Sequence, residues 1–512
     1  MSPIELAILV SRVESICREM GVVLRQAAFS PNIKDRLDFS CALFDTSGEL
    51  FSQAAHIPVH LGSMAYAMRD IVTGVDWQDG DILALNDPFL GGTHLPDVTL
   101  VSPLFIDGEL LGFVANRAHH ANIGASSPGS MPISTTLEEE GLIIPPTLLV
   151  KAGQVVVEEM EKLGGLKGAD VSGDFAAQMS ANRVGVDRLS KLVNKMSVGR
   201  FLDGIDEINA YGERLAKAAL KSIPKGRYRF SDLMDDDGCG TENVEIRVTI
   251  DIEDNGIKVD FDGTSRQVRG NINCPLSVAA AAVFYCFRCL LPENTPACAG
   301  VFRFIDLRAP VGSLVNATRP AATAAGNVET SMRIVDVVLG ALATAIPRVI
   351  PAASQGTMNN VAMGSHESNP PWDYYETIAG GSGASYRTAG ASAVQSHMTN
   401  TLNTPIESLE MHYPLRIRSY SIRRGSGGKG RFQGGDGLVR EFEFLEPAEV
   451  TLITERRRHA PWGLEGGDPG KNGRNSLDGE TLPAKCHINV ERGQVLRVET
   501  PGGGGFGYLG SE

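Results

Sequence analysis

Apolar side chains near the N-terminus recur at steps of three and four residues, which is the spacing of one face of an α-helix. The positions on this face are Leu6, Leu9, Val13, Ile16, Met20 and Val23. Arg12 and Glu14 interrupt the apolar run early, so the segment is not expected to be a secretory signal. No apolar stretch reaches the roughly 18 residues that a membrane span needs. The pattern therefore predicts an amphipathic first helix in a soluble protein.

Two β-hairpins are predicted upstream of residue 120. The first pairs strands over 40–44 and 49–53 through a turn at 46–48. The second pairs apolar runs over 98–106 and 109–115 through Asp107-Gly108, which is among the strongest short hairpin signals. The other expected helices cover 61–72, 180–222, 275–291 and 329–345, and the other expected strands lie at 81–85, near 228, at 244–252 and at 257–261.

The change from helical to β patterns near residue 225 suggests two regions. We expect an α+β region over 1–225 and a second α+β region over 226–512, in which the glycine-rich end beyond 437 is mostly β structure. The fold class predicted is thus α+β and multi-domain, with mixed β-sheets and flanking helices.

Composition narrows the function classes. The formal net charge of −14 and the absence of a Lys/Arg block argue against nucleic acid binding. The eight cysteines follow no framework, so we expect reduced thiols in a cytoplasmic protein. Cys286 and Cys289 have C-x-x-C spacing, but they lie in an apolar run without a second such pair, which favours core packing over a zinc site.

His94, Asp97 and His119 flank the second hairpin. Residues equally distant from the turn pair with one another, which puts Asp97 opposite Ala118, next to His119. Opposed Cβ atoms lie about 4.5–5.5 Å apart, so the three side chains are expected at one end of the hairpin. Two imidazoles and a carboxylate suit a divalent ion and leave a coordination position for water or substrate. The alternative is that these polar residues only cap strand ends.

Residues near this cluster are candidates for supporting roles. Asn86, Asp87, Asn116 and His120 could donate or accept hydrogen bonds around the ligands.

Two further groups precede the cluster in the chain. His56 and His60 are four apart, but Pro58 disfavours a shared helical face, so we expect a structural or pocket-wall role. Asp35, Arg36 and Asp38 form either a solvated loop with an ion pair or, through Asp38, a general base.

The sequence lacks the motifs of several common enzyme classes. The sequence has no H-E-x-x-H, no H-x-H on a strand, no G-x-S-x-G and no P-loop. Residues 466–471 come nearest to a P-loop but are typical of turns, and the run 502–507 lacks the strand-then-helix context of a phosphate site. Nucleotide binding by this chain alone is not supported.

Eight motifs in order along the chain resemble the hydantoinase B/oxoprolinase family. They are NIKDRLDFSCALFD (32–45), HLGSM (60–64), NDPFLGGTHLPD (86–97), NRAHH (116–120), AGNVET (325–330), NTPIE (403–407), APWGL (460–464) and TPGGGG (500–505). The family includes subunits of N-methylhydantoinase, caprolactamase, 5-oxoprolinase, and acetone and acetophenone carboxylases. The resemblance implies a hydantoinase A-type partner that binds ATP and magnesium, in a hetero-oligomer such as A2B2.

The resemblance also implies a metal and a reaction. In acetone carboxylase the homologous chain binds manganese through two histidines and an aspartate, whose spacing matches His94, Asp97 and His119. We expect manganese, zinc or iron here, and an ATP-dependent hydrolase of a hydantoin, a lactam or 5-oxoproline (class EC 3.5.2). Water at the ion would attack a substrate phosphorylated by the partner, with Asp38 accepting a proton and His120 orienting a ligand or donating a proton.

Two alternatives stay open. A ketone carboxylase subunit is the runner-up, although the acetone carboxylase chain is considerably longer than this one. A non-catalytic scaffold for the A-type subunit would have no metal. Glu329 and Glu407 belong to family motifs, but the sequence assigns them no role.

Overall fold

The computed structural model describes residues 1–54, 57–164 and 169–510. The chain forms two compact units. Unit 1 comprises Met1–Gly124, Leu142–Ser222 and Phe284–Asp306, and unit 2 comprises Ala125–Gly141, Ile223–Val283 and Leu307–Glu512. The chain passes from one unit to the other at 124/125, 141/142, 222/223, 283/284 and 306/307, so the two-domain division at 225 stays a prediction. Each unit also takes in a segment from the other half of the chain.

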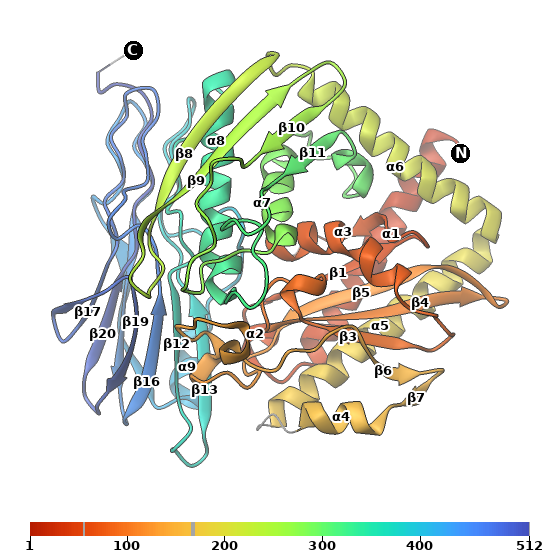
Figure 1. Ribbon diagram of the computed structural model, residues 1–512, viewed down its shortest axis with the longest axis horizontal. Coiled ribbons are helices and arrows are strands. Elements are labelled where there is room, and N and C mark those ends of the chain that lie inside the picture. The colour runs from red at the N-terminus through yellow and green to blue at the C-terminus, as the bar shows by residue number, and fades with distance from the viewer. Residues whose placement is uncertain (55–56, 165–168, 511–512) are drawn as a thin grey trace. The chain divides into compact units, whose positions relative to one another are not determined.

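Unit 1 is a seven-stranded sheet in the order β2-β1-β5-β4-β3-β6-β7, with helices on its faces. Its strands are β1 (Phe39–Phe44), β2 (Leu50–Gln53), β3 (Ile82–Leu85), β4 (Asp97–Ile106), β5 (Glu109–His119), β6 (Thr147–Lys151) and β7 (Gln154–Val155). Its helical elements are α1 (Pro3–Ala27), α2 (Pro31–Lys34), α3 (Pro58–Thr73), η1 (Pro88–Leu90), α4 (Val157–Gly164), α5 (Ala169–Met196), α6 (Val198–Leu220) and η4 (Ala299–Phe302). Both predicted hairpins are confirmed. Strands β4 and β5 of the second one lie side by side in Figure 1.

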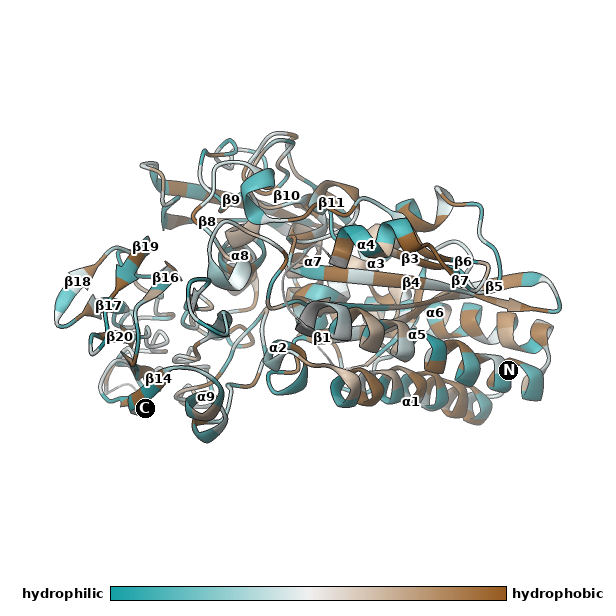
Figure 2. Cartoon of the chain, turned by 90° about the horizontal axis from the view of Figure 1, so that it is seen from below, coloured by the Kyte–Doolittle hydropathy of each residue, from teal (hydrophilic) through white to brown (hydrophobic). Residues whose placement is uncertain are grey.

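Helix α1 shows how the sequence pattern becomes a packed face. Ser2 and Glu5 form a reciprocal capping box at its start, which satisfies two otherwise unpaired backbone N–H groups. Hydrophobic and hydrophilic residues are interleaved along it (Figure 2). Leu6, Leu9, Val13, Ile16 and Met20 are buried as predicted, whereas the last contact is made by Leu24 instead of Val23.

The two faces of the sheet bury different partners. On β4 and β5, Leu104 and Val114 point to the face covered by α1, α5 and α6. Val101 and Phe113 point to the other face, where α3 packs. Neighbouring residues therefore alternate between the two cores, as strand geometry requires. Asp97 and His119 share the α3 face with Val101 and Phe113.

A β-bulge in β5 corrects the predicted register. Phe105 pairs with Leu110 but Leu104 pairs with Gly112, so Leu111 is the extra residue and Asp97 lies opposite His119 instead of Ala118. A Cβ at Gly112 would lie 2.4 Å from the carbonyl oxygen of Phe44, so only glycine fits there. Without the bulge, the side chains of Asp97 and His119 would point to opposite faces of the sheet.

Unit 2 contains three sheets, in the orders β11-β10-β9-β8, β13-β12-β16-β19 and β14-β15-β20-β17-β18. The strands are β8 (Gly226–Asp236), β9 (Glu242–Ile252), β10 (Ile257–Asp260), β11 (Ile305–Arg308), β12 (Asn360–Ser365), β13 (Trp372–Thr377), β14 (Leu415–Arg423), β15 (Gly437–Phe444), β16 (Ala448–Ile453), β17 (Arg474–Leu477), β18 (Glu480–Leu482), β19 (Lys485–Val490) and β20 (Val495–Glu499). Helix α7 (Leu276–Arg288) begins in unit 2 and ends in unit 1. The other helical elements of unit 2 are η2 (Pro128–Ser130), η3 (Leu137–Glu140), the π-helix η5 (Gly326–Thr330), α8 (Ser331–Ala345) and α9 (Ile406–His412).

The β-rich C-terminal part is confirmed, and its two last sheets share one apolar core. Met363 of β12 and Leu452 of β16 belong to the same cluster as Phe442 of β15 and Val498 of β20. Helix α8 packs on β8, where a Cβ at Gly340 would lie 2.5 Å from the ring of Phe230.

The late glycine runs pack backbone against backbone. Gly503 N–H donates to the carbonyl of Gly435, and Gly428 N–H donates to that of Gly503. A Cβ at Gly434 would lie 2.0 Å from the carbonyl oxygen of Gly503. These glycines therefore permit neighbouring chain segments to approach closely, which is a packing role.

All eight cysteines are free thiols, with Cys286 buried and Cys289 exposed. No helix among the described residues has both the length and the apolar character needed to cross a membrane.

Candidate metal centre

The loop before β4 positions the first ligand candidate. A Cβ at Gly92 would lie 2.2 Å from the carbonyl oxygen of Asn86, so glycine allows the loop to fold back on itself. The Asn86 amide donates to the carbonyl of Leu95 at 2.8 Å and to that of Leu142 at 2.9 Å. These contacts fix the turn that carries His94 toward the start of β4.

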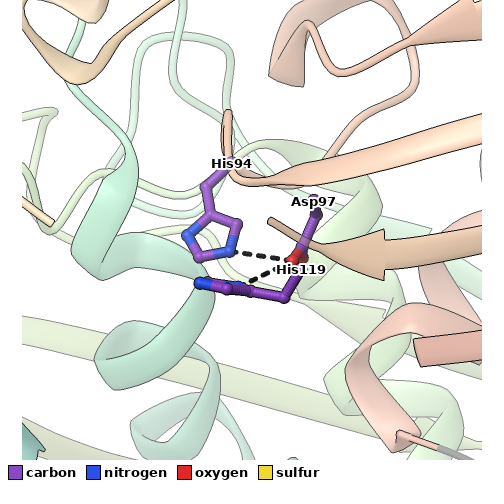
Figure 3. A group of neighbouring side chains, drawn as sticks. All are labelled: His94, Asp97 and His119. Carbon is purple, nitrogen blue, oxygen red and sulfur yellow. Dashed lines mark hydrogen bonds and ion pairs between the residues drawn. The ribbon is translucent and has the colours of Figure 1, made fainter. Parts of the chain in front are cut away.

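His94, Asp97 and His119 converge as predicted (Figure 3). His94 Nε2 and His119 Nδ1 each lie 3.1 Å from Asp97 Oδ1. The three ligand atoms lie within 4.8 Å of one another, and all three residues are buried. Two imidazole nitrogens and a carboxylate oxygen at this spacing match the donor set of a divalent transition-metal site with an open position.

The second oxygen of Asp97 has partners of its own. Thr93 Oγ1 donates to Asp97 Oδ2 at 2.7 Å, and His60 Nε2 lies 3.1 Å from the same oxygen. Neither residue was predicted to contact a ligand. His56, which was considered together with His60, lies outside the described residues.

Burial and neighbouring charges shift the pKa values of Asp97 and His119. Burial would raise the pKa of Asp97, but the neighbouring imidazoles of His94 and His60 outweigh it and hold that pKa well below the usual range. Burial lowers the pKa of His119, against the opposing effect of Asp97. An ionised carboxylate and a neutral imidazole are the forms that bind a cation.

Arg117 anchors the wall of the site. Its guanidinium donates to Thr99 Oγ1 at 2.7 Å, to Ser63 Oγ at 2.6 Å and to the carbonyl of Gly91 at 3.0 Å. Burial lowers the pKa of Arg117 to about 10, so it stays charged at neutral pH. One side chain thus joins β4, β5, α3 and the loop that carries His94.

Asp38 lies beside the cluster, where its carboxylate faces His60 and Arg36. Its Oδ1 lies 3.9 Å from His60 Nε2, and its Oδ2 lies 3.8 Å from Arg36. Both Arg36 and Asp38 are buried, so the solvated-loop interpretation of this segment is wrong. The chain enters β1 at this point, and the carbonyl of Asp38 accepts from His119 N–H at 3.0 Å.

His120 faces α5 instead of the three ligands. Its Nε2 lies 2.9 Å from Gln178 Oε1, and its ring packs on Phe175. Asn116 lies on the same side, where its amide donates to Asn182 at 2.7 Å and to the carbonyl of Gln178 at 2.9 Å. The catalytic role expected of His120 stays a prediction.

The supporting residues expected from the sequence act at a distance. Asn86 fixes the loop, Asn116 binds α5, and Asp87 accepts from Phe89 N–H at the start of η1. Direct support for Asp97 comes from Thr93 and His60.

The two glutamates of the family motifs lie in unit 2. Glu329 is fully buried in the π-helix η5, and its Oε1 accepts from Met358 N–H at 3.0 Å and from the Asn360 amide at 2.6 Å. Glu407 is exposed in the first turn of α9.

A family model described as hydantoinase B/oxoprolinase matches residues 2–509. The chain belongs to this family. It is 38% identical to 5-oxoprolinase 1 of Arabidopsis thaliana over 98% of its length, but it spans only 42% of that protein. It is 30% identical to a putative B-type subunit of a D-/L-hydantoinase from Pseudomonas, covering 99% of this chain and 90% of that one.

Solved structures in the family have the same fold. The ATP-dependent caprolactamase of Pseudomonas jessenii is 27% identical, with a TM-score of 0.93 over 99% of this chain and 91% of that one. An acetone carboxylase chain is similar in fold, with a TM-score of 0.89, 17% identity, and coverage of 99% of this chain and 76% of that one. The family membership indicated by the sequence motifs is confirmed.

Proposed function

We propose that this family member is the B-type subunit of an ATP-dependent amidohydrolase that opens a cyclic amide. The buried group of His94, Asp97 and His119 carries this proposal, because it gathers three ligand atoms within 4.8 Å. The 5-oxoprolinase and hydantoinase relatives supply the class of reaction. The geometry supports a site for one divalent ion, with manganese or zinc as first choices and iron as a third.

A divalent ion bound there would lower the pKa of a coordinated water or polarise an amide carbonyl. The chain's own residues hold the ligand atoms in place and exclude bulk water, since His94, Asp97 and His119 are at most 2% exposed. Asp38 is the proposed proton acceptor, and it reaches the cluster through His60. His120 is proposed to orient the end of β5 through its contact with α5.

We propose a five-membered lactam such as 5-oxoproline as the substrate. The identity to 5-oxoprolinase 1 is 38%, against 30% to the hydantoinase relative. ATP and magnesium are assigned to a separate A-type subunit, because this sequence lacks a P-loop and the Pseudomonas relative is named as one subunit of a hydantoinase. We place the assembly in the cytoplasm, as a hetero-oligomer such as A2B2.

The test is ATP hydrolysis by the chain purified with its A-type partner. We expect ADP release to depend on 5-oxoproline and to match ring-opened product one to one, with slower turnover of hydantoin. ATP turnover that requires a ketone and bicarbonate would contradict the hydrolase proposal and favour the carboxylase. Full turnover by a metal-free enzyme would favour the scaffold role.

A further inference from the structure

The carboxylate of Asp97 is divided between two sets of partners. Oδ1 faces the ligand nitrogens of His94 and His119, each at 3.1 Å. Oδ2 faces Thr93 Oγ1 at 2.7 Å and His60 Nε2 at 3.1 Å. We propose that Thr93 and His60 are positioning residues that hold Oδ2, so that Asp97 binds the ion through Oδ1 alone. This inference rests on the metal site of the proposed function.

The burial and the hydrogen bond of Thr93 fit a positioning role. It is fully buried in the loop that Asn86 and Gly92 fold, and its hydroxyl reaches forward four residues to Asp97. A hydroxyl that donates to an ionised oxygen makes a strong, charge-assisted hydrogen bond, and 2.7 Å is the length expected of one.

His60 contacts the oxygen of Asp97 that Thr93 also contacts. Its Nε2 lies 3.1 Å from Asp97 Oδ2 and 3.9 Å from Asp38 Oδ1. Its Nδ1 has no hydrogen-bond partner among the described residues, so Nε2 is the ring nitrogen that makes these polar contacts. His60 therefore adds a second contact to Oδ2 and leaves Oδ1 to the nitrogens of His94 and His119.

Hydrogen bonds through Ser63 fix the first turn of α3, which carries His60. It lies in the first turn of α3, where Ser63 Oγ donates to its carbonyl at 3.0 Å and to that of Val59 at 2.7 Å. Arg117 donates to the same hydroxyl at 2.6 Å. The helix that carries His60 is therefore tied to β5, two residues before His119.

Binding through one oxygen affects both affinity and coordination. A carboxylate that used both oxygens would take a second position at the ion, which the reaction needs for water or substrate. Outer hydrogen bonds that orient a ligand typically change metal affinity by about 10–100-fold. We therefore expect Thr93 and His60 to raise affinity while keeping one position open.

The test compares variants of the full-length chain by competition between the protein and a chelator for Mn²⁺ or Zn²⁺. Thr93→Val removes the hydroxyl at constant size, and we expect affinity to fall about 10–100-fold. Thr93→Ser keeps the hydroxyl and should restore most of the loss. His60→Phe should weaken binding to a similar extent.

The matched control is Thr451→Val. Thr451 is also buried, but it lies on β16 and its hydroxyl contacts His487. X-ray absorption of the loaded variants should show one more oxygen ligand in Thr93→Val than in wild type. Melting temperatures of the metal-free variants show whether each one folds.

The outcomes separate this inference from the function. Wild-type affinity in Thr93→Val, or equal losses in Thr93→Ser and Thr93→Val, would overturn the positioning role and leave the metal site intact. A wild-type chain that binds neither ion would overturn the metal site and the positioning role together.

Discussion

Replacing His94 with alanine is expected to remove the bound divalent ion and to reduce product formation by at least about 10³-fold. The imidazole supplies one of three ligand atoms, and the remaining pair, Asp97 and His119, cannot enclose an ion by themselves. Loss of the ion removes the activated water or polarised carbonyl on which the reaction depends. Elemental analysis of the purified protein and steady-state turnover with the A-type partner measure the two effects.

His366→Ala is the control for this prediction. That histidine is exposed and paired with Asp373 at 3.2 Å, so its loss should change neither metal content nor turnover. Circular dichroism should show the same folded content in both variants. Turnover that persists in a metal-free His94→Ala enzyme would contradict the proposed role of the site.

Replacing Glu329 with glutamine is expected to remove a pH dependence of stability in unit 2. Burial, reinforced by the negative charge of Glu455, raises the pKa of Glu329 from 4.5 to about 8. The folded protein therefore keeps a proton between these pH values that the unfolded chain releases. The contribution of Glu329 to the free energy of unfolding is therefore most favourable below pH 4.5, and it is lost as the pH rises through 8.

The size of this effect follows from the span of the shift. Each unit of pKa corresponds to about 1.4 kcal/mol, so the wild type should lose on the order of a few kcal/mol from this group between about pH 5 and about pH 8.5. Glutamine keeps the oxygen that accepts from Met358 and Asn360 but does not titrate. The melting temperature of wild type should fall relative to Glu329→Gln across this range.

Glu407→Gln provides the comparison, because Glu407 is exposed. Its melting temperature should follow the wild type at every pH. Parallel curves for wild type and Glu329→Gln would show that Glu329 holds no proton in the folded state.

The proton on Glu329 belongs to a larger buried network. Glu455 lies 2.6 Å from Lys485 Nζ and 3.1 Å from Arg333, and all three side chains are buried. Burial raises the pKa of Glu455, and these two cations oppose that shift, while Glu329 accepts from the neutral donors of Met358 and Asn360. A protonated Glu329 avoids a further negative charge beside Glu455.

Local sequence patterns predicted the elements around the candidate metal site. The turn at Asp107-Gly108, the apolar runs on either side and the spacing of His94 and Asp97 placed three ligand candidates at one hairpin end. These signals are local, because turn chemistry and strand alternation depend on neighbouring residues.

The predicted register of the β4–β5 hairpin was wrong by one residue, although the sequence contains a signal for the bulge. Leu110 and Leu111 are consecutive apolar residues followed by Gly112, which breaks the alternation of the strand. Packing determines the face of the sheet on which each of these two leucines lies. Leu111 joins the core under α1 and α5, while Leu110 packs on the α3 side, so the two faces together impose the shift.

The contacts of Thr93 and His60 with Asp97 were not predicted, for different reasons. Thr93 contacts Asp97 only because the loop folds back at Gly92, and a hydroxyl four residues from a carboxylate is common in loops. His60 comes from α3 and meets a residue that is distant in sequence, and such contacts follow from helix packing alone.

The sequence by itself determined the family, the α+β class and the three residues that gather at the hairpin end, because each rests on motifs or short-range periodicity. Only the tertiary structure decided which face the side chains of Asp97 and His119 occupy, which residues contact each oxygen of Asp97, and that His120 faces α5. Those features depend on which strand residues are buried on each of the two faces of the sheet. That distribution is fixed only when helices pack on both faces.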